Sequence, residues 1–206
     1  GVSEVLAEYL PGPIVTIIEE GNEETPPFFG FYYPEKSIGR MKAFYGHFGM
    51  LVRAYTYITM LGPKGLRDIA EKAVLNANYL MAKVKQDYSL PYDRTCMHEF
   101  VVEGSWKDAP GVHALDISKR LMDYGFHPPT NYFPLIVNEA LMIEPTETES
   151  KQTLDAFAAS LKAIAQEARE NPDLLHNAPH DTPVRRCDEV KAARDLVLCC
   201  WMPDDL

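Results

Sequence analysis

Two short segments combine residue types that could carry out chemistry. His98 and Glu99 are adjacent and could form an acid–base pair, but consecutive residues of a strand point to opposite faces, which favours a structural role. The segment "EPTETE" (144–149) places three carboxylates within six residues, which could hold a cation or serve in acid–base catalysis. The alternative is that Glu147 and Glu149 occupy the first turn of a helix, where the helix dipole favours anions. That alternative does not explain the first glutamate of the segment, Glu144.

A third segment, "YGHFG" (45–49), comes directly before an apolar helical stretch. Glycines near the start of a helix let backbone N–H groups approach an anion, and the histidine side chain could add a donor. Of the other histidines, His127 precedes Pro-Pro in a turn and is expected to form a hydrogen bond there. His113 and His176 have no evident partner, and "APH" at 178–180 is a loop feature to which the sequence assigns no purpose.

Common catalytic and metal-binding motifs are missing from the sequence. It contains no glycine-rich nucleotide-binding motif, no HExxH, no GxSxG and no paired CxxC. The cysteines lack metal-ligand spacing, so no metal site is expected, and unpatterned cysteines are typical of a reduced cytosolic protein. They are Cys96, Cys187, Cys199 and Cys200. The residues by themselves therefore indicate no self-contained active site.

The composition is that of a folded, acidic protein. The chain has 206 residues, 46% of them hydrophobic, and a net charge of -10. A nucleic-acid or anionic-membrane partner would favour a basic face, because phosphate contacts depend on lysine and arginine, and no such face is evident. The longest apolar run, "LVLCCWM" (196–202), is far shorter than the roughly 20 residues of a membrane helix and is expected to be buried or to dock. Since the first residues also lack a secretory signal pattern, we expect a cytoplasmic protein with no nucleic-acid or membrane partner.

Two helices and an aromatic segment organise the first part of the chain. Residues 48–62 are apolar nearly all round and are expected to form a helix buried on several sides. Gly62 ends this helix and Pro63 begins the next, whose apolar residues recur at spacings of three and four up to about Lys85. Residues 26–37 hold five aromatics between prolines. This extended segment needs a large apolar surface, which the chain is not expected to supply alone.

Residues 95 to 170 predict a compact α+β unit in the order strand, helix, strand, strand, helix. Gly125 closes the helix at 114–124, and Pro-Pro prevents its continuation. "TNYFPLIV" (130–137) and "ALMIE" (140–144) then follow as neighbouring strands. Thr146 and Glu149 have the spacing of a capping box for the last helix.

Four segments of the chain resemble the glycine dehydrogenase (decarboxylating) family, the P-protein of the glycine cleavage system, and in particular subunit 2 of its two-subunit form. They are "KSIGRMKAFYGHFGMLVRAYTYI", "GLRDIAEKAVLNANYLMAKVK", "DISKRLMDYGFHPPTNYFPLIVNEALMIEPTETES" and "TPVRRCDEVKAARD". The resemblance implies an α+β fold, namely the end of the large domain plus the small C-terminal domain of a PLP-dependent transferase of the aspartate-aminotransferase type. It also implies an enzyme that decarboxylates glycine with pyridoxal 5'-phosphate (PLP) and passes the aminomethyl group to a lipoyl arm. The implied partners are P-protein subunit 1, the lipoylated H-protein and the chain's own large domain, within an oligomer.

The family's Schiff-base lysine follows a histidine, and none of the eleven lysines here does. The resemblance therefore implies the C-terminal portion of a longer subunit, inactive alone, with no catalytic residue, no metal and no bound cofactor of its own. Its implied parts are the closing part of the large domain (1–62), a connecting helix (63–87), a small α+β domain (88–178) and a tail (179–206).

In related folds, the loop before the helix at 48–62 reaches the cofactor phosphate of a neighbouring subunit. The resemblance therefore implies Gly46, His47 and Phe48 as cofactor-binding residues. Two other hypotheses stay open at this point. One is a non-catalytic module that docks with a partner or oligomerises, and the other is a hydrolase that uses His98 and Glu99.

Overall fold

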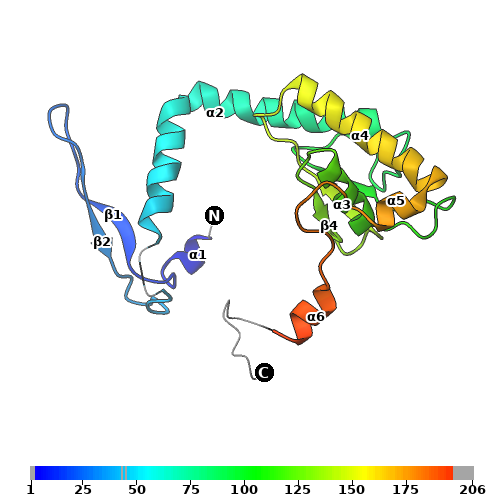
Figure 1. Ribbon diagram of the computed structural model, residues 1–206. Helices are drawn as coiled ribbons and strands as arrows, with labels where there is room; N and C mark the ends of the chain where they lie inside the picture. Colours follow the sequence, from blue (N-terminus) through cyan, green and yellow to red (C-terminus); the bar gives the residue numbers. More distant parts are fainter. Residues whose placement is uncertain (1–2, 43, 45, 197–206) are drawn as a thin grey trace. The chain divides into compact units, whose positions relative to one another are not determined.

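The computed structural model describes residues 3–42, 44 and 46–196, and the chain divides into two compact units, Gly1–Met60 and Leu61–Leu206 (Figure 1). Apart from its first residue, the predicted apolar segment 196–202 lies outside the described residues, with Cys199 and Cys200. In the part of the chain that is described, no helix is long and apolar enough to cross a membrane.

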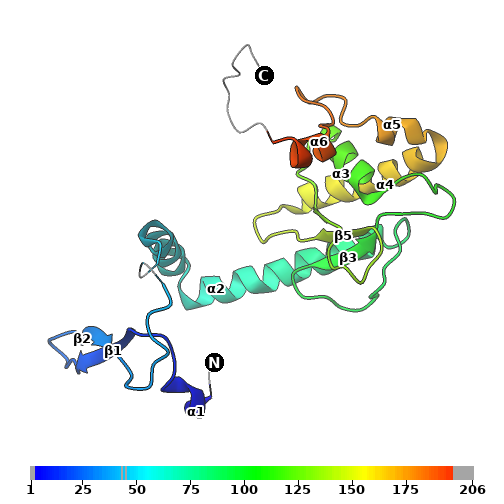
Figure 2. The same cartoon turned by 90° about the horizontal axis from the view of Figure 1, so that it is seen from below.

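The first unit is built around a β-hairpin, which is easily followed in Figure 2. Helix α1 (Glu4–Ala7) precedes strand β1 (Ile14–Glu19), which pairs in antiparallel fashion with β2 (Phe28–Tyr32). A two-stranded hairpin is at best marginally stable in water, so this element needs further contacts to persist.

Large apolar side chains of this hairpin are exposed to solvent. The register places Val15 opposite Phe31 and Ile17 opposite Phe29, so that these four side chains share one face. The exposed set of the two strands comprises Val15, Ile17, Ile18, Phe28, Phe29, Phe31 and Tyr32. Among the described residues, the chain does not cover this aromatic segment, as its sequence predicts.

Helix α2 (Phe48–Val84) joins the two predicted helices at a break. Gly62 has φ 61° and ψ -178°, a backbone conformation that glycine adopts at low cost, and Pro63 follows it. The predicted end and start at these residues are therefore confirmed. The prediction that residues 48–62 are buried on several sides is wrong for this chain: Phe48 and Met60 are about four-fifths exposed, since no described residue covers them.

The second unit combines the remainder of α2 with a three-stranded antiparallel sheet in the order β3–β5–β4. Its further elements are β3 (Phe100–Glu103), α3 (Ala114–Asp123), β4 (Thr130–Asn131), β5 (Ala140–Ile143), α4 (Lys151–Glu170), α5 (Pro172–His176) and α6 (Glu189–Arg194). The predicted order of strand, helix, strand, strand, helix is confirmed, and the fold mixes helices and sheet as an α+β protein does.

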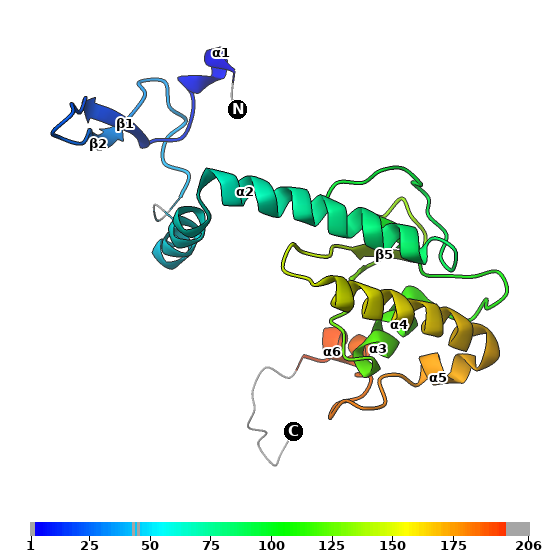
Figure 3. The same cartoon turned by 90° about the horizontal axis from the view of Figure 1, so that it is seen from above.

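One hydrophobic core holds the second unit together. Helix α4 runs alongside the last turns of α2 (Figure 3), and the Tyr88 hydroxyl, just beyond α2, donates to the carbonyl of Leu161 at 2.9 Å. The fully buried larger side chains come from α2, β3, α3, β5, α4 and α5 and from the loop before α3. They are Leu80, Val84, Val102, Val112, Ile117, Leu121, Leu141, Leu161, Ile164 and Leu175. The last turns of the apolar stripe predicted up to about Lys85 therefore face this core.

One predicted strand of the second unit is corrected. The strand predicted at 130–137 ends at Asn131, because Tyr132 takes φ 59° and turns the backbone out of the extended conformation. Leu135 and Ile136 beyond it are 87% and 80% exposed. After Asn171 a short helix, α5, begins with a proline at its first turn.

A partly buried ion network links α3 to α4. Arg120 pairs with Glu167 through two contacts, at 2.9 and 3.0 Å, and with Asp123 at 3.0 Å. The other oxygen of Asp123 accepts the backbone N–H groups of His180 and Asp181. Burial raises the pKa of Asp123, but the two amides and the guanidinium outweigh this and hold that pKa below its usual value. The pKa of Glu167 is likewise raised by burial and lowered more strongly by Arg120 and the hydroxyl of Tyr124.

Candidate functional site

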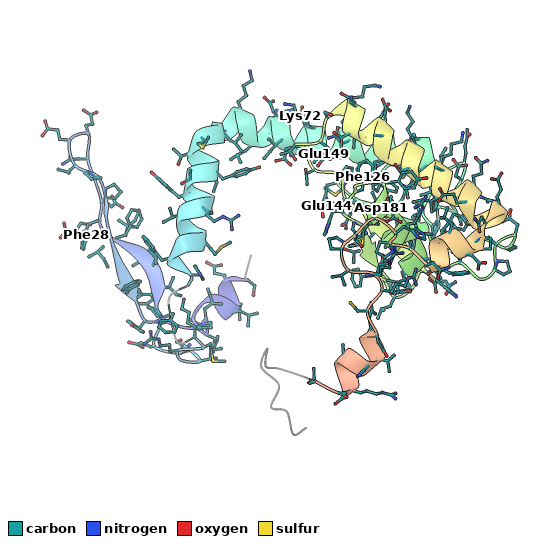
Figure 4. The ribbon with its side chains drawn as sticks, viewed as in Figure 1. Phe28, Lys72, Phe126, Glu144, Glu149 and Asp181 are labelled. Atoms are coloured by element: carbon teal, nitrogen blue, oxygen red, sulfur yellow. The ribbon has the colours of Figure 1, made fainter. Side chains whose placement is uncertain are left out.

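A pocket of about 390 Å³ in the second unit collects three segments that sequence analysis singled out. One wall is the turn 125–130, "GFHPPT"; a second is 142–145, the end of β5 with Glu144 and Pro145; a third is the start of α4. Figure 4 labels three of the lining residues: Phe126, Glu144 and Glu149. This pocket is the main candidate site of the described residues.

The turn 125–130 has a clear local cause. Gly125 takes φ 80° and ends α3, and the N–H of Phe126 returns to the carbonyl of Leu121 at 3.1 Å. Pro128 and Pro129 then prevent helix continuation, and Thr130 pairs with Met142 in the sheet. The Phe126 ring packs edge-on against Phe157 of α4, with 5.1 Å between centroids. These contacts fix the turn beside the pocket.

The acidic segment 144–149 lies ahead of α4, not within its first turn. Helix α4 begins at Lys151 and is capped by Ser150, whose side-chain oxygen accepts the N–H of Thr153 at 3.0 Å. The predicted capping box of Thr146 and Glu149 is therefore wrong: the cap lies one residue after that glutamate. The helix-dipole explanation for the carboxylates fails for the same reason, since no acidic residue occupies the first turn of α4.

Two asparagines of "LNANYL" in α2 brace the loops around the site. The Asn76 amide donates to the carbonyls of Thr146 at 2.9 Å and Glu149 at 3.4 Å. Asn78 donates to the carbonyl of Cys96 at 2.8 Å and accepts the N–H of the same residue at 3.0 Å. The resemblance marked this segment without giving either side chain a role. Two asparagines only two residues apart in one helix were the signal available for finding them.

We expect Asn76→Ala to loosen the acidic segment. The variant leaves two loop carbonyls without their donor, which costs about 1 kcal/mol of unfolding free energy. Amide hydrogen exchange should speed up at residues 146–150, while exposed Asn138→Ala serves as the control and leaves exchange there unchanged. Equal exchange in wild type and Asn76→Ala would show that these bonds do not hold the segment.

A second pocket, of about 350 Å³, is also lined by the acidic segment, through residues 144–147. Its apolar wall belongs to α2, with Leu66, Ile69 and Ala73 among its residues, and Met97 and His98 face it across the pocket. Glu144 and Pro145 line both pockets. His98 and Glu144 thus line the same pocket, whereas Glu99, the predicted acid–base partner of His98, lines neither pocket.

Three further histidines have structural partners that the sequence did not reveal. His113 Nδ1 lies 3.4 Å from the Glu139 carboxylate, and His176 Nδ1 lies 3.4 Å from that of Asp116. The His180 ring nitrogen Nε2 lies 2.8 Å from the carbonyl of Leu174, so "APH" ties the tail to the core. The expectation that His113 and His176 lack partners is therefore wrong.

The predicted cofactor-binding residues lie at the start of α2. Gly46 takes φ 128°, and α2 begins at Phe48. The N–H of Met50 reaches both the carbonyl of His47, at 3.0 Å, and its ring Nδ1, at 3.3 Å. A Cβ on Gly49 would lie 3.2 Å from that ring, so glycine leaves room for it. The imidazole thus caps the helix through Nδ1, which leaves Nε2 and the backbone to meet an anion.

The described residues fit only one edge of a PLP site. The start of α2 offers backbone donors suited to a phosphate, but neither pocket of the second unit is lined by a lysine that could hold the cofactor covalently. In the described ranges no three His, Cys, Asp or Glu side chains are grouped to hold a metal ion.

Comparison with known families decides the assignment. The family described as glycine dehydrogenase, C-terminal domain, matches residues 69–182, a range that includes both asparagines, the turn 125–130 and the acidic segment. The chain belongs to this family. The resemblance inferred from the sequence motifs is thereby confirmed for the C-terminal portion of the glycine dehydrogenase (decarboxylating) subunit 2.

Relatives of the chain carry the same name along nearly its whole length. The probable glycine dehydrogenase (decarboxylating) subunit 2 of Alkaliphilus oremlandii is 59% identical over 198 residues, 96% of this chain and 39% of the relative. That of Chlorobium chlorochromatii is 57% identical over 201 residues, 97% of this chain and 40% of the relative. The chain therefore spans about two-fifths of the length of these glycine dehydrogenase subunits.

A solved structure shares the fold. It is a crystal structure of glycine decarboxylase (P-protein) of the glycine cleavage system in inhibitor-bound form, with a TM-score of 0.60 and 20% identity. The match covers 78% of this chain and 37% of that one. At this level of identity the comparison supports the arrangement of elements alone.

Proposed function

We propose that this chain acts as the C-terminal part of a glycine dehydrogenase (decarboxylating) subunit 2, in an enzyme that decarboxylates glycine with PLP. The observation that carries the proposal is the 55–59% identity to such subunits over 96–99% of the chain. The whole enzyme would pass the aminomethyl group to the lipoyl arm of H-protein, with P-protein subunit 1 as partner, in the cytoplasm. When bound, PLP supplies the electron sink for loss of carbon dioxide.

The chain's own residues would complete a site that other residues begin. We propose that 1–62 closes the large domain of an aspartate-aminotransferase-like fold, that 63–87 connects, that 88–178 forms the small domain and that 179–206 is its tail. The exposed apolar hairpin and the exposed start of α2 support this, because contiguous apolar surface of this kind marks an interface.

At the site, Gly46, His47 and Phe48 would hold the phosphate edge of the cofactor. The backbone N–H groups of a helix start favour an anion, and His47 Nε2 could add one donor. No lysine of the chain follows a histidine. We therefore propose that the chain alone neither anchors PLP nor decarboxylates glycine.

A chimera tests the proposal. The upstream three-fifths of the Alkaliphilus oremlandii subunit 2 would be fused to this chain at the matched position and combined with subunit 1 from the same organism. We expect exchange of the glycine carboxyl group with labelled bicarbonate from the chimera, and none from the 206-residue chain with subunit 1. An inactive but folded chimera would contradict the proposal.

A second function rests on the same exposed hairpin. A non-catalytic docking or oligomerisation module would also carry Val15, Ile17, Phe29 and Phe31 uncovered. In that case the chimera would assemble with subunit 1 without turning over glycine.

A further inference from the structure

We propose that the pocket beside Glu144 binds a primary ammonium group carried on a short apolar chain. The inference rests on the lining of the two pockets and does not depend on the proposed function. The ligand class follows from three features: the apolar walls of the pocket, the carboxylates that line it, and the nearby lysines, which pair with Asp155 instead of with these carboxylates.

The walls of the 390 Å³ pocket suit a hydrocarbon chain. Leu80 and Leu154 are buried at its base, and the edge-on pair of Phe126 and Phe157 forms one side. Ligand pockets of proteins begin at about 300 Å³ and are mostly apolar with a few polar groups. A chain of about five carbons would bury apolar surface against these walls, which favours its binding.

The carboxylates that line the pocket favour a cation. Glu144 and Glu149 line it, and Glu144 also lines the 350 Å³ pocket next to it. Among the described residues, no lysine or arginine lines either pocket. Of the lysines on the adjoining helices, Lys83 and Lys151 pair with Asp155 at 3.2 and 2.6 Å.

The structure gives Glu144 no part in helix capping, since α4 is capped by Ser150. Glu144 instead follows directly on β5 and lines both pockets, so its carboxylate is available to the charged end of an apolar chain bound against Phe126. The Asn76 amide donates to the carbonyls of Thr146 and Glu149 and so holds the segment that follows Glu144 in place. A charged hydrogen bond from an ammonium to Glu144 would therefore form without rearrangement of the segment.

Nuclear magnetic resonance titration of the ¹⁵N-labelled chain tests the inference with n-pentylamine as probe. Pentan-1-ol provides the same chain without the charge, and pentanoate provides the opposite charge. We expect the amide signals of Gly125, Glu144 and Thr153 to shift with pentylamine, with a dissociation constant about fivefold lower than for pentan-1-ol and with no binding of pentanoate. High salt should weaken the pentylamine response and leave that of pentan-1-ol unchanged.

Glu144→Gln keeps the shape of the side chain and removes its charge. It should bring pentylamine down to the affinity of pentan-1-ol, whereas Glu170→Gln, an exposed glutamate at the end of α4 that lines neither pocket, should change nothing. Unchanged amide signals of the core would show that both variants are folded. Equal binding of amine and alcohol, full affinity of folded Glu144→Gln, or no shift with any probe would each overturn the inference.

The ammonium could belong to a free amine or to a lysine side chain of a partner polypeptide. Nα-acetyl-lysine N-methylamide separates these sources because it carries the same chain on a peptide backbone. Binding at least as tight as that of pentylamine assigns the pocket to a lysine side chain, and binding of pentylamine alone assigns it to a free amine. Both results support the recognition of an alkylammonium group.

Discussion

Arg120→Ala is expected to lower the unfolding free energy of the second unit by about 3 kcal/mol, because it leaves two largely buried carboxylates without their cation. The Asp123 side chain is 2% exposed and that of Glu167 is 20% exposed. Urea unfolding followed by the signal of Trp106, a residue of this unit, measures the change. Arg67→Ala is the matched control: its pair with Glu71 is solvent-exposed on α2, and its loss should cost less than about 0.5 kcal/mol.

The same variant should flatten the acid branch of the stability profile. The pKa values of Asp123 and Glu167 are lowered in the folded state, so their stabilising contribution is present above their unfolded pKa values of about 4. It is lost as pH falls through the folded values. Wild type should therefore lose stability from about pH 5 downward, and Arg120→Ala should lose less. Parallel profiles for the two proteins would contradict the assigned network.

Arg186→Ala should release the tail from α3 and destabilise the unit by about 2 kcal/mol. The Arg186 guanidinium donates to Asp116 at 2.7 Å and to the carbonyls of Leu175 and Ala178 at 2.9 and 2.7 Å. Asp116 is only 4% exposed, so the carboxylate left behind is costly.

The neighbouring Arg185 provides the control, because its side chain is exposed. We expect hydrogen exchange at residues 187–195 to rise strongly in Arg186→Ala and to stay at the wild-type level in Arg185→Ala. An equal rise of hydrogen exchange in both variants would contradict this prediction. It would show that the positive charge of the tail, and not the contact with Asp116, holds residues 187–195.

Local signals in the sequence predicted the elements well where one residue type dictates the backbone. Gly62 and Gly125 end their helices in positive-φ conformations, and the pairing of β4 with β5 follows the predicted neighbours. The strand predicted at 130–137 failed because periodicity cannot show that Tyr132 takes a positive φ. The capping box failed because Ser150, four residues after Thr146, takes the role of N-cap.

The candidate site could be predicted in part. The turn 125–130 and the acidic segment were recognised, and Glu144 was the carboxylate that helix capping did not explain. That these segments meet at one pocket depends on the antiparallel pairing of Thr130 with Met142 and on α4 packing beside them, which spacing alone does not fix. The role of Asn76 depends on a contact 70 residues along the chain, so only the fold reveals it.

The first unit shows a different limit. The sequence predicts that the chain does not cover the aromatics of β2, whereas it predicts burial for the apolar residues 48–60, and the described residues leave both sets exposed. An apolar helix stretch shows by itself that its side chains favour burial, but it does not show whether the same chain supplies the covering surface. Their exposure here agrees with the proposal that the first unit closes a larger domain.

Covalent trapping of the cofactor tests the central claim most directly. The purified chain would be incubated with PLP, reduced with borohydride and digested, and each lysine peptide would be quantified by mass spectrometry beside the subunit 2 of Alkaliphilus oremlandii. We predict one fully modified lysine in the relative, outside the region that this chain matches, and only weak, scattered modification of the eleven lysines here. One lysine of residues 1–206 modified to completion, in a chain that then decarboxylates glycine unaided, would contradict the account.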